Sequence, residues 1–142
     1  MVLPGKIISI NIAARKGIEK DSVGEAMVIE NWGLEGDAHA GNWDRQVSVF
    51  PVEALDKVAS HKIDEVLNGG YTENFTISGI PLEELVVGKS LILGDAEIII
   101  THIGKDEFKE HGRPYAVSRE GRFGRVVKGG KVKTGDEVRI KP

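Results

Sequence analysis

Glycine divides this chain into short segments, and this spacing limits the folds that it can adopt. The 142 residues include 18 glycines, and only short apolar runs lie between them. Residues 6–13 (KIISINIA) alternate apolar and polar side chains with the two-residue period of a half-buried strand. Short runs bounded by glycine are typical of β-strands. Because closing a sheet on itself removes its exposed edges, we expect a mostly β fold, a closed or nearly closed β-barrel with one or two short helices.

Further segments fit this barrel. Strands are predicted at residues 24–30, 45–50, 90–93 and 97–101, and a polar loop at 31–44. Pro51 is expected to open a short helix with Val52, Leu55 and Val58 on one face. Residues 69–79 are predicted to be rich in turns. No linker or low-complexity tract interrupts the chain, so residues 1–142 are expected to form a single domain.

One sequence pattern occurs twice. Residues 88–95 (GKSLILGD) resemble residues 129–136 (GGKVKTGD), and an apolar segment follows each. A Gly-Asp pair between two apolar runs is a hairpin signal. The pattern predicts two similar hairpins in one barrel, and the alternative is a chance similarity of two Gly-Asp turns.

Composition excludes several classes of protein. No apolar run approaches the ~20 residues that cross a bilayer. The first residues, MVLPGKIISINIAARKG, lack the apolar core and cleavage pattern of an export signal, so a cytoplasmic location is expected. Cysteine is absent, which rules out disulfides, thiolate metal sites and a thiol that carries a persulfide.

Positive charge gathers near the end of the chain. Residues 1–101 carry 8 Lys and Arg against 16 Asp and Glu, whereas residues 102–142 carry 11 against 6. Residues 118–130 (SREGRFGRVVKGG) place arginines and a lysine among glycines, which let a backbone approach a ligand closely. Guanidinium groups bind phosphate or carboxylate in bidentate fashion. The segment predicts the floor of an anion site, and the alternative is a solvated basic face.

Five motifs in this order resemble the MOSC domain, the C-terminal domain of molybdenum cofactor sulfurases, which also occurs as small stand-alone prokaryotic proteins. They are GLEGDAHAGNWDRQVS at residues 33–48, ENFTISGI at 73–80, GKSLILGDAEI at 88–98, IGK at 103–105 and SREGRFGRVVKGGKVKTGD at 118–136. The resemblance implies a β-rich barrel that binds molybdenum cofactor (molybdopterin) or passes sulfur to it. In fused relatives a separate pyridoxal-phosphate-dependent domain generates the persulfide, and no pyridoxal phosphate is expected on this chain.

One segment departs from the family. Many members carry a cysteine between the IGK and SREG motifs, where it is thought to hold the transferable sulfur. Residues 106–118 read DEFKEHGRPYAVS here, and Glu107, His111 and Tyr115 lack the polarisable, low-pKa sulfur that the transfer needs. We therefore expect a role in cofactor sulfuration, carriage or use without a cysteine persulfide. Whether the chain is itself an enzyme stays open.

The motifs supply residues expected to bind an anionic pterin. The predicted cofactor-binding set is Gly36, Arg45, Asn74, Lys105, Ser118, Arg119, Glu120, Arg125 and Lys128. Arg122 occupies a position that is often apolar in relatives, and we expect it at the surface. Asn74 either donates its amide to the ligand or caps the turn before Phe75. Phe75 and Phe123 are assigned to the core or the pocket wall.

His39 and Asp37 are the candidate catalytic residues. A compact Gly-Asp-Ala-His loop can bring a carboxylate and an imidazole to one pocket wall for proton transfer. The alternative is structural, with Asp37 forming an Asx-type turn and pairing with Arg45. Residues 105–111 form a mixed-charge loop that is either a lid over the pocket or plain surface. No zinc spacing relates the chain's four histidines, so no protein-bound metal is expected, and any molybdenum would arrive within its cofactor.

Other functions remain as alternatives. The chain could be a molybdenum-cofactor-dependent enzyme acting on N-hydroxylated small molecules, a non-catalytic nucleic-acid- or protein-binding barrel, or a scaffold subunit for a separate sulfurase. The expected partners are a pterin or other small anionic ligand and a cysteine desulfurase or molybdoenzyme, with no membrane partner. Near the basic segment only Tyr115 and Phe123 could stack on bases, which disfavours nucleic acid.

Overall fold

The computed structural model describes residues 4–13, 21–57, 73–104 and 121–141 of the chain. These residues contain eleven strands and two short 3-10 helices. The strands are β1 (Gly5–Ile12), β2 (Asp21–Val23), β3 (Glu25–Ile29), β4 (Gly33–Leu34), β5 (Val47–Pro51), β6 (Phe75–Ser78), β7 (Ser90–Leu93), β8 (Ala96–Ile103), β9 (Arg122–Lys128), β10 (Gly130–Lys133) and β11 (Glu137–Ile140). The helices are η1 (Val52–Lys57) and η2 (Leu82–Glu84).

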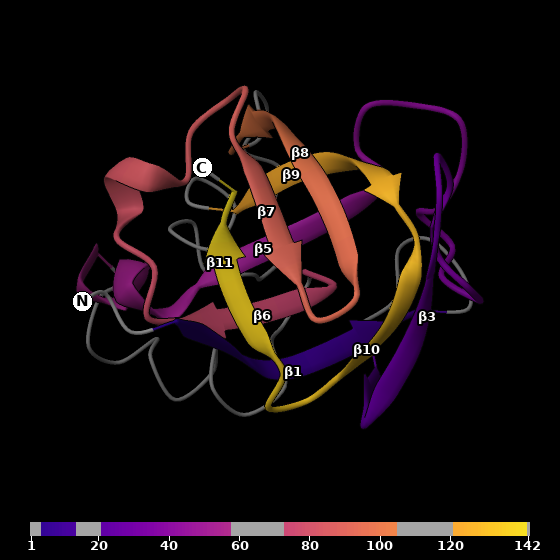
Figure 1. The fold of residues 1–142 in the computed structure, drawn as a ribbon, viewed down its shortest axis with the longest axis horizontal. Helices are drawn as coiled ribbons and strands as arrows, with labels where there is room; N and C mark the ends of the chain where they lie inside the picture. The colour runs from indigo at the N-terminus through magenta and orange to yellow at the C-terminus, as the bar shows by residue number, and fades with distance from the viewer. Residues whose placement is uncertain (1–3, 14–20, 58–72, 105–120, 142) are drawn as a thin grey trace.

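Seven of these strands close a barrel (Figure 1). Hydrogen-bonded neighbours follow the order β11–β7–β8–β9–β5–β6–β1, and β1 pairs again with β11. Gly5 and Lys6 at the start of β1 lie opposite Val138 and Glu137 of β11, which completes the ring. Strands β5 and β6 are parallel, and the other neighbouring pairs of the ring are antiparallel. The predicted closed, mostly β barrel is confirmed.

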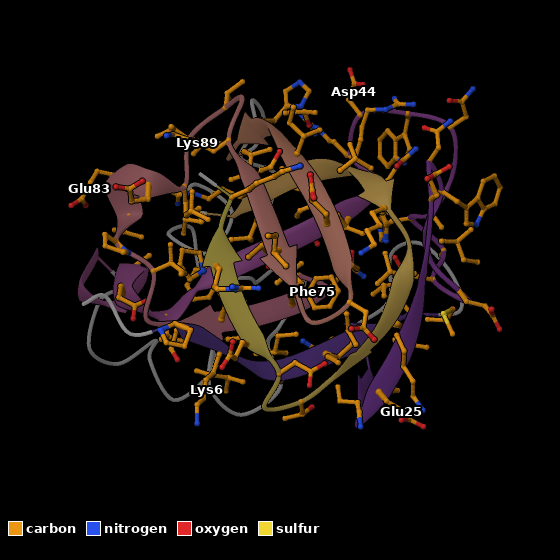
Figure 2. All side chains as sticks on the ribbon, in the orientation of Figure 1. Lys6, Glu25, Asp44, Phe75, Glu83 and Lys89 are labelled. Carbon is orange, nitrogen blue, oxygen red and sulfur yellow. The ribbon has the colours of Figure 1, made fainter. Side chains whose placement is uncertain are left out.

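The barrel interior is filled by large apolar side chains. Phe75 on β6 lies in the middle of the barrel (Figure 2) and is fully buried. On β1 both Ile7 and Ile10 are buried although they are three residues apart, because the register against β6 shifts between Ile7 and Ser9. The extra residue of such a bulge restores the inward direction of the strand's next apolar side chain. Burying each large side chain contributes roughly 1.5–3 kcal/mol, so this alternation fixes which face of each strand is inside.

A second, smaller sheet flanks the barrel. Strand β3 lies between β10 and β4 and stands at the right edge of the view in Figure 1. Val28, Leu34 and Val132 on its inner face belong to the same apolar cluster as the barrel interior. Strand β9 leads into β10 through Gly129, so one continuous stretch of chain serves both sheets.

The prediction of two similar hairpins is half wrong. Strands β7 and β8 form a hairpin around Gly94 and Asp95, as expected. In contrast, β10 pairs with β3, and β11 pairs with β7 and β1. The turn at Gly135 and Asp136 therefore carries the chain from one sheet to the other, and the backbone N–H of Lys133 donates to the Asp136 carboxylate at 2.8 Å. Similar turn residues fix a local bend and leave the strand partners undetermined.

Two further boundaries differ from those predicted. Pro51 is the last residue of β5, opposite Ile77 of β6, and helix η1 begins after it; Val58 lies outside the described residues. Part of the segment predicted to be rich in turns is strand β6, in which Phe75, Thr76 and Ile77 are all buried. Side chains buried on both faces hide the alternation by which a strand is recognised.

Glycines of the basic segment allow close contact between strands. A Cβ added to Gly124 would lie 2.5 Å from the Ile99 carbonyl oxygen, and one added to Gly130 would lie 2.7 Å from the Asp95 carbonyl oxygen. Both distances are far below van der Waals contact. These glycines therefore pack against neighbouring backbone, and the expectation that they bring the chain close to a ligand is wrong for them.

Replacing Gly124 by alanine should lower the free energy of unfolding by roughly 1–3 kcal/mol, because the barrel backbone must shift to admit the methyl group. Gly24 is the matched control, since nothing lies within 4 Å of its added Cβ. Gly24→Ala should leave stability unchanged or raise it slightly. Urea denaturation of the two variants measures the difference, and equal midpoints would contradict the packing argument.

Candidate functional site

Polar side chains form a row across the outer face of the barrel. Ser48 of β5 lies opposite Phe123 of β9, and Phe123 lies opposite His102 of β8. On the other side Ser48 is joined to Asn74, and the backbone N–H of Asn11 on β1 donates to the Asn74 carbonyl at 2.7 Å. Ser48, Asn74 and Asn11 are buried although they lie outside the barrel core.

Asn74 is the centre of this row. Its side-chain oxygen accepts the backbone N–H of Ser48 at 3.0 Å, and its amide donates to the Asn11 carbonyl at 3.1 Å. The same amide donates to the Asp37 carboxylate at 3.0 Å, and the Asn74 backbone N–H donates to Ser48 Oγ at 2.9 Å. One side chain thus connects three strands and the loop that contains Asp37. A simple cap of the turn before Phe75 would need far fewer partners.

Asp37 fastens the loop between β4 and β5 to the barrel. Gly36 precedes it with φ at +84°, a left-handed conformation that glycine adopts without strain. One carboxylate oxygen of Asp37 accepts the Ala13 backbone N–H at 3.0 Å, and the other accepts the Asn74 amide. The expected proximity of Gly36, Asp37 and Asn74 is therefore present, with the carboxylate already engaged by the fold.

Several members of this network did not emerge from the sequence. Ser48, Asn11 and Glu73 are all buried, and so is the nearby Thr76, which makes no side-chain hydrogen bond to them. Asn11 donates to the Glu73 carbonyl at 3.1 Å. Thr76 Oγ1 is buried and has no hydrogen-bond partner among the described residues. The available signal was a polar residue inside an apolar strand, such as Ser48 in RQVSVF, which indicates a second buried face.

Arg45 lies directly beside the polar row. Its guanidinium carbon is 5.0 Å from the centre of the Phe123 ring, a cation–π arrangement, and Phe123 is the cross-strand neighbour of Ser48. Among the described residues no hydrogen bond or ion pair engages its N–H groups. In particular Arg45 does not pair with Asp37 there, contrary to the structural alternative. The stacking orients a planar cation while leaving its donors available.

Arg125 lies two residues beyond Phe123 on β9, and its donors are engaged. It forms an ion pair with Asp44 at 2.9 Å and donates to the side-chain oxygens of Asn31 at 2.7 Å and Asn42 at 3.3 Å. Gln46, fully buried, donates to the same Asn31 oxygen at 3.2 Å and accepts the Val126 backbone N–H at 2.9 Å. Arg125 thus holds the polar loop against β9.

Arg122 was expected at the surface, and that expectation is wrong. Its side chain is buried, and it donates to the carbonyls of Leu85 at 3.0 Å and Leu82 at 3.4 Å. These two carbonyls belong to the short helix η2 and the residue after it. A guanidinium can be buried when backbone acceptors satisfy it. Arg122 therefore has a structural role in holding η2 against β9.

Of the remaining predicted cofactor-binding residues, one is described by the structure and four lie outside its described part. Lys128 is exposed at the far end of β9, opposite Glu97, and six residues of strand separate it from Arg122, roughly 20 Å at ~3.3 Å per residue. It lies apart from the polar row. Lys105, Ser118, Arg119 and Glu120 lie outside the described residues. The residues on either side of the segment 105–120 are in contact, since the Gly121 carbonyl accepts the Gly104 N–H at 2.7 Å.

The histidines are placed separately. His39 is partly buried, and its carbonyl accepts the Trp43 indole N–H at 2.8 Å. His102 lies on β8, with Nδ1 at 3.1 Å from Thr101 Oγ1. Within the described ranges no group of three or more His, Asp or Glu side chains is arranged to hold a metal ion. Of the two predicted catalytic residues, Asp37 is thus joined to the polar row through Asn74, and His39 contacts Trp43 through its backbone carbonyl.

Two surface hollows lined by described residues lie elsewhere, around β11. Neither contains a residue of the predicted site. The site is instead defined by the polar row, the Asp37 loop and Arg45. Its class is that of a closed β-barrel with a buried hydrogen-bonded network on one outer face and one oriented cation beside it.

Comparison with known proteins identifies the family. Residues 36–139 match the MOSC domain, and the chain belongs to this family. The structure is similar to that of the YuaD protein from Bacillus subtilis, with a TM-score of 0.74 and 18% identity over 97% of this chain and 96% of that one. It is also similar to YiiM from Escherichia coli (TM-score 0.66, 18% identity, 96% and 70% covered) and from Geobacillus stearothermophilus (0.69, 20%, 98% and 76%).

At these identities the structural likeness shows the fold alone. A comparison with curated proteins found no match. In the part of the chain that the structure describes, no helix has the length and apolar character to cross a membrane.

Asn74→Ala should lower the free energy of unfolding by roughly 2–4 kcal/mol, because it leaves several buried partners unsatisfied, at about 1–3 kcal/mol each before relaxation. Asn42→Ala is the matched control, since it removes only an exposed contact of 3.3 Å to Arg125. It should change stability by less than about 0.5 kcal/mol. Thermal unfolding of both variants tests this, and similar losses would show that Asn74 does not organise the network.

Proposed function

We propose that this MOSC protein binds the anionic pterin of molybdenum cofactor, in the cytoplasm, beside the polar row on the outer face of β5, β6 and β9. The main support for this proposal is the environment of Arg45. Its guanidinium is oriented by the Phe123 ring, and no hydrogen bond or ion pair among the described residues engages it. Phosphate and carboxylate groups are the partners that such a fork binds in bidentate fashion.

The residues present fit the chemistry of this group. A pterin phosphate requires cations and neutral hydrogen-bonding groups, and Arg45 lies over Phe123, the cross-strand neighbour of Ser48 in the polar row. Arg45 would hold the phosphate, and Ser48 and Asn74 would keep its surroundings rigid through the network. When bound, the cofactor would supply the redox or sulfur chemistry, while the protein contributes binding and electrostatics.

The resemblance extends the proposed set. Lys105, Ser118, Arg119 and Glu120 belong to the family motifs at residues 103–105 and 118–136, and we include them as cofactor-binding residues. His39 is the proposed proton-transfer residue, and Asp37 positions Asn74 through its carboxylate. Arg125 contributes by holding the loop that contains Asp37. Lys128 was predicted as a cation of the pocket and is proposed here only as a distant source of positive potential.

The absence of cysteine limits what this chain does alone. Persulfide transfer requires a thiolate, so any sulfur for the cofactor would come from a separate cysteine desulfurase. The recipient of the cofactor would be a molybdoenzyme. The chain's own part in such a sequence is to bind and present the cofactor.

Arg45→Ala should reduce bound pterin at least about 10-fold, because a hydrogen bond to a charged group is worth about 1.5–3 kcal/mol. The protein would be purified at low oxygen from cells that make the cofactor, and molybdenum and the fluorescence of the oxidised pterin would be measured. The control is Arg139→Ala, an exposed arginine on β11 away from the polar row. Equal retention in both variants, or no pterin on the unaltered protein, would overturn the proposal.

A further inference from the structure

The outer face of the small sheet has an arrangement of side chains that the pterin site does not explain. The direct cross-strand neighbour of Met27 is Lys131 on β10. On the other side the pairing of Val28 with Leu34 and of Ile29 with Gly33 continues to Glu35, whose backbone N–H donates to the Met27 carbonyl at 2.9 Å. Cross-strand neighbours share a face of the sheet. One row across this face therefore consists of a cation (Lys131), an apolar side chain (Met27) and an anion (Glu35).

Apolar side chains along this face are unusually exposed. Met27 is 45% exposed, Ile29 is 37% exposed and Trp32, in the turn after β3, is 47% exposed. The alternate residues of the same strands, Val28 and Leu34, are buried against the barrel. Met27 and Ile29, two residues apart on β3, therefore share the exposed face, and exposed apolar side chains that lie together are typical of an interaction site.

Rigid supports hold the turn at the end of this face. The Asn31 backbone N–H donates to the Val126 carbonyl at 2.9 Å, and the Asn31 side chain is bound by both Gln46 and Arg125. Trp32 follows immediately and donates its backbone N–H to the Ile29 carbonyl at 3.1 Å. The backbone that presents the indole is thus fixed before any partner arrives, which lowers the entropic cost of binding.

The charged residues on either side of Met27 indicate which partner would bind this face of the small sheet. Lys131 lies one strand to one side of Met27 and Glu35 one strand to the other, so roughly 10 Å separates the two charged positions at ~4.8 Å per strand. A two-fold axis parallel to β3 would turn a second copy over so that its Glu35 faces Lys131 of the first, and its Lys131 faces Glu35. Met27 and Ile29 of the two copies would then meet in the centre.

We propose that the outer face of β3, β10 and β4 is a self-complementary interface through which two copies of this chain form a dimer. Isologous contacts require each surface to complement itself, and the order of Lys131, Met27 and Glu35 does so. Ile29 lies opposite Gly33 on β4 and close to Gly129, and neither of these two residues has a side chain of its own. Glu25, which pairs with Lys131 at 3.0 Å, lies at the exposed start of β3 (Figure 2) and leaves Lys131 further donors.

Charge-reversal variants test this arrangement. Lys131→Glu and Glu35→Lys each place two like-charged pairs in the dimer, so each should raise the dissociation constant at least about 10-fold in sedimentation equilibrium. An equimolar mixture of the two variants should restore association close to the unaltered value, because in the mixed dimer both pairs are again opposite in sign. Circular dichroism melting of each variant confirms that it is folded.

Lys133→Glu is the matched control. Lys133 is on the same strand and face as Lys131 and lies opposite Glu25. On the other side of β3 no residue of β4 pairs with Glu25, so the two-fold arrangement gives Lys133 no strand residue to face in the second copy. It should change the dissociation constant less than about 2-fold. A protein that is monomeric at all accessible concentrations would overturn the proposal, as would a dimer that the Lys131 and Glu35 variants leave intact or a mixture that fails to associate. Because pterin content is not measured, these outcomes are independent of the cofactor proposal.

Discussion

The buried side chain of Asn74 holds together the parts of this protein on which a site can be built. Its hydrogen bonds join β1, β5 and β6 to the loop that contains Asp37. These partners are buried, so each would be expensive to leave unsatisfied. The network therefore has one arrangement in which all its groups are paired, and this fixes the outer face of the barrel beside Phe123 as rigidly as the apolar interior fixes the strands.

Three arginines have separate roles, although two of them, Arg122 and Arg125, are close in the sequence. Arg122 supports a short helix through two backbone carbonyls, and Arg125 ties the polar loop to β9. Arg45 lies over the Phe123 ring, and no described residue forms a hydrogen bond or ion pair with its guanidinium. Successive side chains of a strand point to opposite faces, so residues three apart on β9 lie on different sides of the sheet. Proximity to glycines in the sequence did not reveal these tasks, because Gly124 and Gly130 serve the packing of neighbouring strands.

Much of the architecture was predictable. Glycine spacing and two-residue alternation located β1, β3, β5, β7 and β8 to within a few residues and indicated a closed barrel. The family motifs placed Gly36, Asp37, Asn74 and Arg45 in one candidate site. The structure joins Asp37 to Asn74 by a hydrogen bond and places Arg45 over Phe123, the cross-strand neighbour of Ser48. Strand β6 was missed because both of its faces are buried, which removes the alternation of apolar and polar residues. The partners of β10 and β11 were missed because the residues of a turn do not determine which strands pair. The burial of Arg122 was missed for a related reason: its acceptors are carbonyls some forty residues away.

Local sequence determined which segments are strands, where the chain turns, and that no thiol chemistry is available, since these properties depend on side-chain type and spacing alone. The tertiary structure decided how Arg122 and Arg125 are engaged, that Arg45 lies over Phe123, and that Lys131 and Glu35 lie on either side of Met27. Hydrogen bonds and ion pairs between distant segments exist only once the barrel has closed. Their formation depends on distances that no linear pattern contains.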